Sequence, residues 1–309
     1  IVLGRGATIG DALIGGADYV MFTGSTPSGR RIAEQAGARL IGCSLELGGK
    51  NAMLVLADAD LERAVEGAVR ACFSSSGQLC ISIERLYVAS TIYDRFVPAF
   101  VAAVRSMRLG AGYDFSYSMG SLTSADQVTA MRGHVADAVE RGATVLAGGR
   151  ARPELGPYFF EPTVLTGVTP SMRCFGEETF GPLVSIYPFT EPGEAIERAN
   201  DTSYGLNASV WTKDVARGRE VGALLHAGTV NINEAYAAAW GSIDAPMGGM
   251  GESGLGRRHG SEGLLKYTEA QTLSRQRLMN IGPIGPMDYA TWAKIMSGAL
   301  KVLRRTGWR

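Results

Sequence analysis

The sequence predicts an α/β fold in which helices cover parallel β-sheets. Short apolar runs of strand length alternate with longer stretches of helical periodicity over most of the 309 residues, a pattern typical of parallel sheets. The chain is long enough for two domains with sizeable cores. Apolar residues make up 46% and charged residues 19%, which is the balance of an ordinary globular protein.

The first elements follow a strand–helix rhythm. Residues 1–10 (IVLGRGATIG) resemble a strand that runs into a glycine turn, as if the chain began inside a domain. A helix is expected over residues 25–37, because Ser25 or Thr26 can cap it and Pro27 suits its first turn. Strands are expected in residues 18–24, 39–47 and 51–56.

The same rhythm continues along the chain. Residues 58–73 predict an amphipathic helix. Further strand and helix patterns lie in residues 85–90, 91–107, 124–149, 183–200 and 214–233, whereas residues 156–168 are irregular. After residue 260 the pattern changes, and residues 262–278 predict a short helical turn followed by an extended strand.

The last segment, residues 287–305, predicts a helix with one apolar face and a basic end. Its apolar face consists of Trp292, Ile295, Met296, Ala299 and Leu303. We expect this face to dock on the body of the protein's own oligomer, with a membrane surface as the alternative.

Composition excludes several classes of function. Lys plus Arg (30) equals Asp plus Glu (30), so charge indicates no nucleic-acid partner. The four cysteines have no C-x-x-C spacing, and with three histidines they predict neither a metal site nor a disulfide framework. A reducing, cytoplasmic compartment is expected. No apolar run approaches the ~18 residues of a membrane span, and no signal peptide is visible.

Two side chains lie in settings that suggest chemistry. Cys80 follows small and polar residues in SSSGQLCIS, where a thiol can be reached and loop amides can stabilise its thiolate. Cys43, Cys72 and Cys174 have apolar or ring-bearing neighbours and are interpreted as core cysteines. Glu46 stands between two leucines in LELGGKN, so it is either a paired structural carboxylate or a base with a raised pKa.

Two glycine-rich stretches suggest a nucleotide. GRGATIG misses the dinucleotide fingerprint G-x-G-x-x-G by one residue. FTGSTPSG follows a strand and opens a helix, the context in which backbone amides receive a pyrophosphate. Turn glycines without a ligand are the alternative interpretation of both stretches.

Taken together, these motifs resemble those of the aldehyde dehydrogenase superfamily. FTGSTPSG, LELGGKN, GQLCIS, EETFGP and PMGGMGESGLGR stand in that family's order, from Ile1 to about Leu273. The resemblance implies part of a Rossmann-type cofactor domain, a parallel α/β catalytic domain and a bridging strand. The expected domains are residues 1–45 (cofactor), 46–248 (catalytic), 249–275 (return segment and oligomerisation strand) and 276–309 (helical tail).

The resemblance also implies roles for individual residues. Cys80 would be the nucleophile that forms a thiohemiacetal and then a thioester, and Glu46 the base for the hydrolytic water. The cofactor, NAD or NADP, would be held by Gly24, Ser25, Gly29, Leu47, Glu178 and Phe180. No metal is implied, and a homodimer or homotetramer is expected.

The substrate is expected to be succinate semialdehyde or a similar small aldehyde, because residues 231–269 resemble the succinate-semialdehyde branch. Ser74 stands where many members of that branch carry an arginine for the substrate carboxylate, and neither Arg70 nor Arg85 is at that position. Ser82 stands where some members have a second, redox-active cysteine.

Two other functions remain open. One is a non-catalytic remnant or partner subunit that lacks the front of the cofactor site, which would leave this chain alone with little turnover. The other is acyl transfer to coenzyme A, which Glu46 disfavours.

Overall fold

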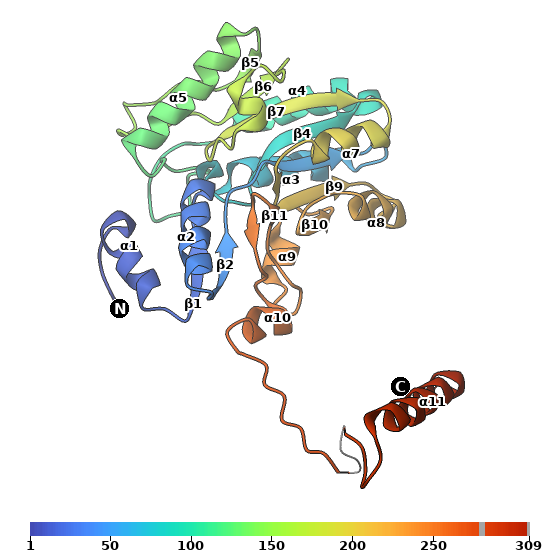
Figure 1. The fold of residues 1–309 in the computed structure, drawn as a ribbon. Helices are drawn as coiled ribbons and strands as arrows, with labels where there is room; N and C mark the ends of the chain where they lie inside the picture. The colour runs from blue at the N-terminus through green and yellow to red at the C-terminus, as the bar shows by residue number, and fades with distance from the viewer. Residues whose placement is uncertain (278–281, 308–309) are drawn as a thin grey trace. The chain divides into compact units, whose positions relative to one another are not determined.

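The computed structural model describes residues 1–277 and 282–307, which divide into two compact units between Thr268 and Glu269. The first unit holds a seven-stranded sheet and a three-stranded sheet (Figure 1). The second unit holds one long helix, α11 (Tyr289–Thr306). No helix in the described ranges is long and apolar enough to cross a membrane.

The large sheet confirms the predicted parallel α/β fold. Its strands run in the order β10-β9-β3-β4-β7-β6-β5, and all neighbours are parallel except β5 and β6. The central strands are buried at every residue, which explains their nearly continuous apolar sequences. The strands are β3 (Asn51–Val55), β4 (Ile83–Ala89), β5 (Thr144–Ala147), β6 (Thr163–Thr166), β7 (Leu183–Phe189), β9 (Asn207–Trp211) and β10 (Thr229–Ile232).

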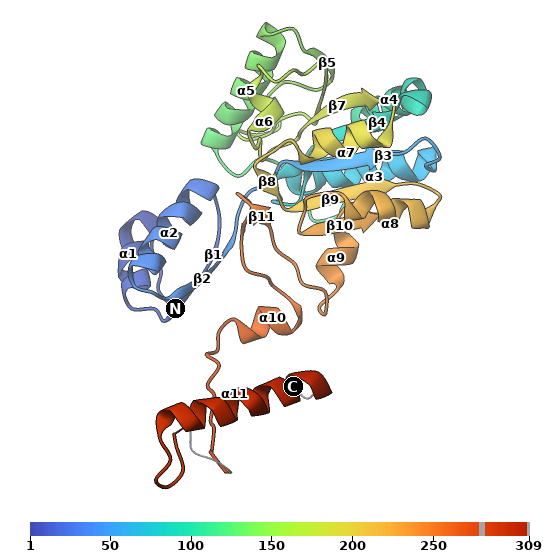
Figure 2. The same ribbon diagram turned by 45° about the vertical axis from the view of Figure 1, so that its right-hand side comes forward.

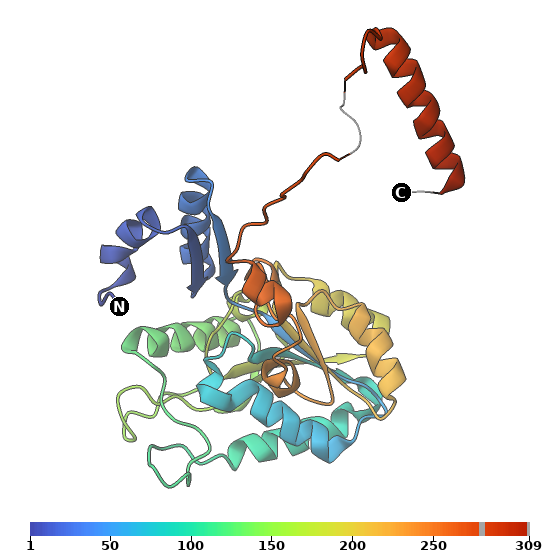
Figure 3. The same ribbon diagram turned by 90° about the horizontal axis from the view of Figure 1, so that it is seen from below.

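Helices cover both faces of this sheet. Seen from below, α3 and α4 lie on one side of the strands and α7 and α8 on the other (Figure 3). This follows from chain direction, because right-handed crossovers that move in opposite directions along a sheet place their helices on opposite faces. The helices are α3 (Leu61–Phe73), α4 (Ser90–Arg105), α5 (Ala125–Glu140), α6 (Arg173–Gly176), α7 (Pro192–Asn200), α8 (Val215–Ala223) and α9 (Ala237–Gly241).

The three-stranded sheet joins distant parts of the chain. β1 (Tyr19–Thr23) and β2 (Gly42–Glu46) are parallel, and β12 (Gly254–Leu255) adds to β2 in the antiparallel sense. Helix α2 (Thr26–Ala38) packs on β1 and β2, and α1 (Gly6–Gly15) packs on α2 (Figure 2). Two short strands, β8 (Tyr204–Gly205) and β11 (Met250–Gly251), pair nearby.

Two sequence predictions are wrong. Residues 1–3 form no strand, and the glycine-rich stretch after them is α1, whose Asp11 pairs with Arg31 of α2 at 2.8 Å. The glycines were interpreted as a turn, although Ile9, Leu13 and Ile14 have helical spacing. In residues 262–277 the short helical turn is present as the end of α10 (Gly260–Leu265), but residues 269–277 form no strand within the described chain. The end of that predicted segment, residue 278, lies outside the described residues.

The helix expected in residues 287–305 is confirmed as α11. The predicted domain boundaries remain predictions. The three-stranded sheet takes strands from both sides of the expected boundary at residues 45 and 46, because Glu46 of β2 is paired with Thr23 and with Gly254.

We predict that Gly254→Ala lowers the free energy of unfolding by about 1–3 kcal/mol. Gly254 has a φ of +139°, and a Cβ at this position would overlap the carbonyl oxygen of Leu45 in β2. Urea unfolding of both proteins measures the difference. Gly120→Ala is the matched control, because a Cβ at Gly120 meets nothing within 4 Å. Equal effects of the two substitutions would contradict the close approach of β12 to β2.

Candidate active site

Several predicted site residues, among them Cys80, Glu178 and Phe180, lie in segments that lead into the central strands. Asn51 begins β3, Ile83 begins β4 and Asn207 begins β9, and the register pairs Asn51 with Ile83. Residues 178–180 closely precede β7. Because these strands are parallel, their starts lie at one edge of the sheet, and the segments that lead into them meet there.

Cys80 lies in a tight turn between the short 3₁₀ helix η1 (Ser74–Gly77) and β4. Three consecutive residues before the turn, Ser75, Ser76 and Gly77, have left-handed φ values of 50°, 57° and 68°. The hydroxyl of Ser76 donates to the carbonyl oxygen of Gly120 at 3.0 Å, which helps to hold this unusual backbone in place.

Two asparagines, Asn51 and Asn207, hold the turn around Cys80 by hydrogen bonds. The side-chain amide of Asn51 donates to the carbonyl oxygens of Cys80 and Ser82, both at 2.8 Å, and its Oδ1 accepts from the backbone N–H of Asn207 at 3.0 Å. Asn207 donates in turn to the carbonyl oxygen of Ile81 at 3.0 Å. This role of the two asparagines was not predicted from the sequence. The signal was a polar residue at the start of each otherwise apolar strand.

The Cys80 thiol is half-buried, and its surroundings disfavour the thiolate. Its nearest apolar neighbours form a small cluster of Ile81, Leu206 and Met247. Burial raises the pKa of the Cys80 thiol, and the carboxylates of Glu46 and Glu178 raise it further. A hydrogen bond from the Cys80 backbone N–H and the positive charge of Arg258 partly oppose this rise in pKa, and the expectation that loop amides stabilise the thiolate stays a prediction. Of the other cysteines, Cys72 and Cys174 are buried as predicted, whereas Cys43 is half-exposed.

Glu46 ends β2 and is buried. Its carboxylate has no hydrogen-bond or ion-pair partner among the residues that the structure describes, so it is not a paired structural carboxylate in this part of the chain. Burial raises the pKa of Glu46, and the positive charges of Arg258, Lys266 and Arg257 partly oppose that shift. Both properties suit a general base.

Glu178 lies against two glycines of the LELGGKN motif. Its Oε1 accepts from the Gly49 backbone N–H at 2.9 Å, and a Cβ on Gly48 would overlap its other carboxylate oxygen. Burial raises the pKa of Glu178 to about 7, and the neighbouring Glu84 adds to the shift. Within the described chain Oε2 accepts no hydrogen bond, so it is available to a ligand.

A buried ion pair supports the segment that carries Glu178. Lys50 and Glu84 are 2.5 Å apart, with side chains 0% and 4% exposed. The Glu84 carboxylate also accepts from the backbone N–H groups of Thr179 at 3.0 Å and Phe180 at 3.1 Å. Phe180 has a φ of 45°, and the amide donors fix that conformation. Nothing in the sequence indicated this ion pair.

The remaining predicted cofactor residues lie at the start of α2. The backbone N–H of Gly24 donates to the carbonyl oxygen of Glu46 at 3.0 Å, which places this turn beside the candidate base. Ser25 precedes the helix and makes no side-chain cap to it. Gly29 packs against Leu47, since a Cβ on Gly29 would lie 2.5 Å from a Leu47 methyl carbon.

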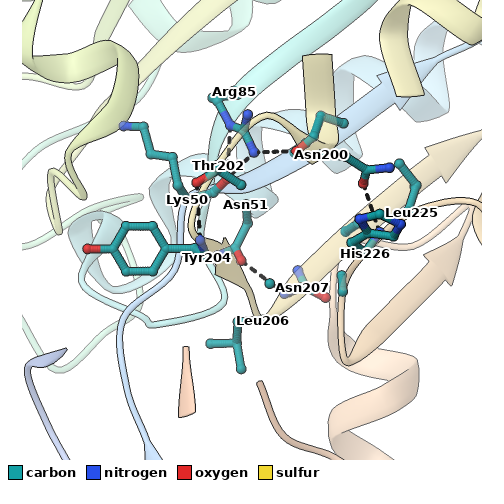
Figure 4. Close-up of a pocket in the computed structure, with 15 residues that line it drawn as sticks. Lys50, Asn51, Arg85, Asn200, Thr202, Tyr204, Leu206, Asn207, Leu225 and His226 are labelled. Carbon is teal, nitrogen blue, oxygen red and sulfur yellow. Dashed lines mark hydrogen bonds between the residues drawn. The ribbon is translucent and has the colours of Figure 1, made fainter. Parts of the chain in front are cut away.

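The two arginines near the nucleophile in sequence differ in role. Arg85 is buried, and its guanidinium donates to the backbone carbonyls of Lys50, Arg198 and Ala199 at 2.6–3.0 Å. It lines a pocket of about 20 Å³ together with Asn51, room for about one water molecule (Figure 4). That pocket does not include Cys80 or Glu46. Arg70 is half-exposed, pairs with Glu234 at 3.3 Å, and lines a surface groove with Ser74.

Comparison with known proteins gives one family. The family model described as "Aldehyde dehydrogenase family" matches residues 1–273. A putative succinate-semialdehyde dehydrogenase [NADP(+)] 2 of Mycobacterium ulcerans is 58% identical over 95% of this chain and 57% of its own length. The succinate-semialdehyde dehydrogenase [NADP(+)] of Escherichia coli is 39% identical over 87% of this chain and 55% of its own length. The chain therefore spans little more than half the length of these relatives.

Solved structures agree with this result. An aldehyde dehydrogenase of Bacillus cereus in complex with NAD+ superposes with a TM-score of 0.82 at 41% identity, over 86% of this chain and 54% of that one. A betaine aldehyde dehydrogenase of Staphylococcus aureus in complex with NAD+ gives a TM-score of 0.82 at 38% identity, over 86% and 53%.

We predict that Glu178→Gln raises the free energy of unfolding at pH 8 by up to about 3 kcal/mol. The folded pKa of about 7 lies above the ordinary value of 4.5, so the folded chain binds more protons than the unfolded chain between these pH values. This carboxyl therefore makes stability fall as pH rises through that window. Glutamine keeps an acceptor for the Gly49 N–H and removes the titration.

Urea unfolding between pH 4.5 and 8 measures the effect. Glu177→Gln is the matched control, because that neighbouring side chain is exposed and paired with Arg173 at 3.0 Å. The prediction fails if Glu178→Gln leaves the pH dependence of the urea midpoint unchanged.

Proposed function

Because this chain belongs to the aldehyde dehydrogenase family, we propose that the whole protein oxidises a small aldehyde to its carboxylic acid with NAD(P)+. One observation carries the proposal. A half-buried cysteine and a buried, unpaired glutamate, from segments 34 residues apart (80 − 46), lie close enough for the carboxylate to raise the pKa of the thiol. A nucleophile and a base for water in one site are what the reaction needs.

The chain's own residues account for bond making and proton transfer. The Cys80 sulfur, as thiolate, attacks the aldehyde carbonyl carbon to form a thiohemiacetal. The alkoxide form of this adduct collapses to a thioester on Cys80 as the hydride leaves that carbon, and bound NAD(P)+ would supply the acceptor for the hydride. Glu46 takes a proton from water as the water oxygen attacks the thioester carbon. The C–S bond then breaks, and the carboxylic acid and the Cys80 thiolate are released. The raised pKa of Glu46 suits proton uptake near neutral pH.

Several groups in this site fit a dinucleotide. Glu178 keeps one carboxylate oxygen available, and its other oxygen is fixed by Gly49, so it can accept hydrogen bonds from ribose hydroxyls. The first turn of α2, with Gly24 and Ser25, presents backbone amides at a helix N-terminus, where phosphate groups bind. The two Mycobacterium and Escherichia relatives are named for NADP(+), and the two solved structures hold NAD+.

We propose a semialdehyde as the substrate, with Arg258 as the residue that binds its carboxylate. The Arg258 backbone pairs with Met247 at 2.8 and 2.6 Å, and Met247 packs in the apolar cluster around Cys80. Its charge lowers the pKa of both Cys80 and Glu46, which indicates that the guanidinium lies near both. Its side chain has no hydrogen-bond partner among residues 1–277 and 282–307. Arg258 thus offers the positive charge that Ser74 cannot.

We predict that Cys80→Ser lowers turnover of succinate semialdehyde by at least about a thousandfold. We expect Glu46→Gln to keep a single burst of NAD(P)H and to slow the steady state by about 10²–10⁴-fold, because only thioester hydrolysis needs the base. Both effects are measured by the absorbance of the NAD(P)H that the whole protein forms in the absence of coenzyme A. Cys43→Ser is the control thiol, half-exposed in β2 and outside the site.

Three results would change the proposal. Full activity in Cys80→Ser would mean another nucleophile. A requirement for coenzyme A would assign the protein to acyl transfer. Absence of activity in the whole wild-type protein, with a folded and dinucleotide-free state, would favour the remnant or partner subunit.

We predict that Arg258→Met raises KM for succinate semialdehyde by about 10–100-fold and leaves KM for butyraldehyde unchanged. Butyraldehyde has a similar carbon chain and no carboxylate, so only the charged substrate loses a partner. Arg70→Met is the matched control. Equal losses on both aldehydes would make Arg258 a structural residue, and a selective loss in Arg70→Met would assign the carboxylate to Arg70.

A further inference from the structure

Helix α11 is a separate structural feature beyond the dehydrogenase family match, which ends at residue 273. It is delimited by its own caps. The Asp288 side chain accepts from the backbone N–H of Thr291 at 2.7 Å, and Gly307 ends the helix with a left-handed φ of 70°. The helix is thus encoded locally over 18 residues.

One face of α11 is apolar. Met296, Ala299 and Leu303 follow one another at spacings of three and four residues, which places them on one side of a helix. Trp292 continues this row toward the N-terminus but is itself buried, with 7% of it exposed, so the solvent-facing part of the face begins after it. Large apolar side chains flank this row and face solvent: Tyr289 is 77% exposed, Leu300 62% and Val302 60%. Single exposed apolar residues are ordinary, but a continuous face of them marks a contact surface.

The opposite face of α11 is basic throughout. Lys294 and Lys301 are seven residues apart, and Arg304 and Arg305 follow one turn later. No aspartate or glutamate occurs between residues 289 and 306. The solvent-facing side of α3 is different, because it mixes Glu62 and Glu66 with Arg63 and Arg70. Charged side chains of both signs are sufficient to keep a helix soluble. Because the charged side chains of α11 are all positive, they indicate an anionic partner.

We propose that α11 binds the surface of an anionic lipid bilayer, with its axis in the plane of the interface. The apolar face enters the boundary between headgroups and acyl chains, and the basic side chains extend to the lipid phosphates around it. A protein groove that covered the apolar face would leave the four cations on the far side without a function. A bilayer surface uses both faces of the helix, and charge complementarity therefore favours it.

The test is sedimentation of the full 309-residue chain with vesicles. We expect it to sediment with vesicles of phosphatidylglycerol and phosphatidylcholine in equal parts, and much less with phosphatidylcholine alone. Added salt should weaken the binding, because surface potential is screened by ions. Replacing Leu300 and Leu303 by asparagine should reduce partition by at least roughly tenfold. Lys301→Gln with Arg305→Gln should have a similar effect on the anionic vesicles only.

Ser297→Asn is the matched control, because Ser297 is exposed between Lys294 and Lys301 on the basic face. It introduces the same residue into the same helix and should leave binding unchanged. Urea unfolding of each variant reports whether the first unit is intact.

Several outcomes would overturn the proposal. The chain would fail to sediment with anionic vesicles, or it would bind neutral vesicles as well as anionic ones. Alternatively, the variant with both Leu300→Asn and Leu303→Asn would sediment as much as the unchanged chain does. A change in oligomeric state on sedimentation velocity, caused by the leucine substitutions in the absence of lipid binding, would assign the face to a second copy of the chain.

Discussion

The site depends on one buried ion pair, between Lys50 and Glu84. Each residue lies at the amino end of a different central strand, Lys50 just before β3 and Glu84 in β4, and the Glu84 carboxylate also holds two amides ahead of β7. Isolated buried charges are strongly unfavourable, so each partner requires the other. The pair therefore ties three strand starts together, and it sets the position of Glu178 relative to Cys80.

This arrangement has an electrostatic consequence. Parallel sheets usually bind ligands at the carboxyl ends of their strands, but here the polar residues gather at the amino ends. Glu46, Glu84 and Glu178 lie in a partly buried region with the Cys80 thiol, and of these three carboxylates Glu84 alone has a buried cation as partner among the described residues. The pKa values of Glu46, Glu178 and Cys80 are all raised as a result. Each shift favours the protonated form relative to the same group in water.

The sequence predicted the alternating strands and helices of the fold and the site residues that lie in recognisable motifs. Alternating apolar runs predicted the parallel sheet because its strands are buried on both faces. The positions of Cys80 and Glu46 followed from motif order. The Lys50–Glu84 pair could not be predicted, because nothing local distinguishes it from exposed charges. The left-handed backbone conformations of Ser75 and Ser76 could not be predicted either, because such φ values are rare in residues other than glycine. The strand expected near residues 269–277 failed because a strand exists only where it finds a partner to pair with.

The pairing of β12 with β2 has a consequence for the order of assembly. Glu46 is held between Thr23, 23 residues before it (46 − 23), and Gly254, 208 residues after it (254 − 46). Closing so long a loop is slow compared with local folding. The turn around Cys80 depends on Asn207, which is synthesised 47 residues before Gly254 (254 − 207). The residues that hold the nucleophile are therefore all present in the growing chain before the strand that pairs beside its base.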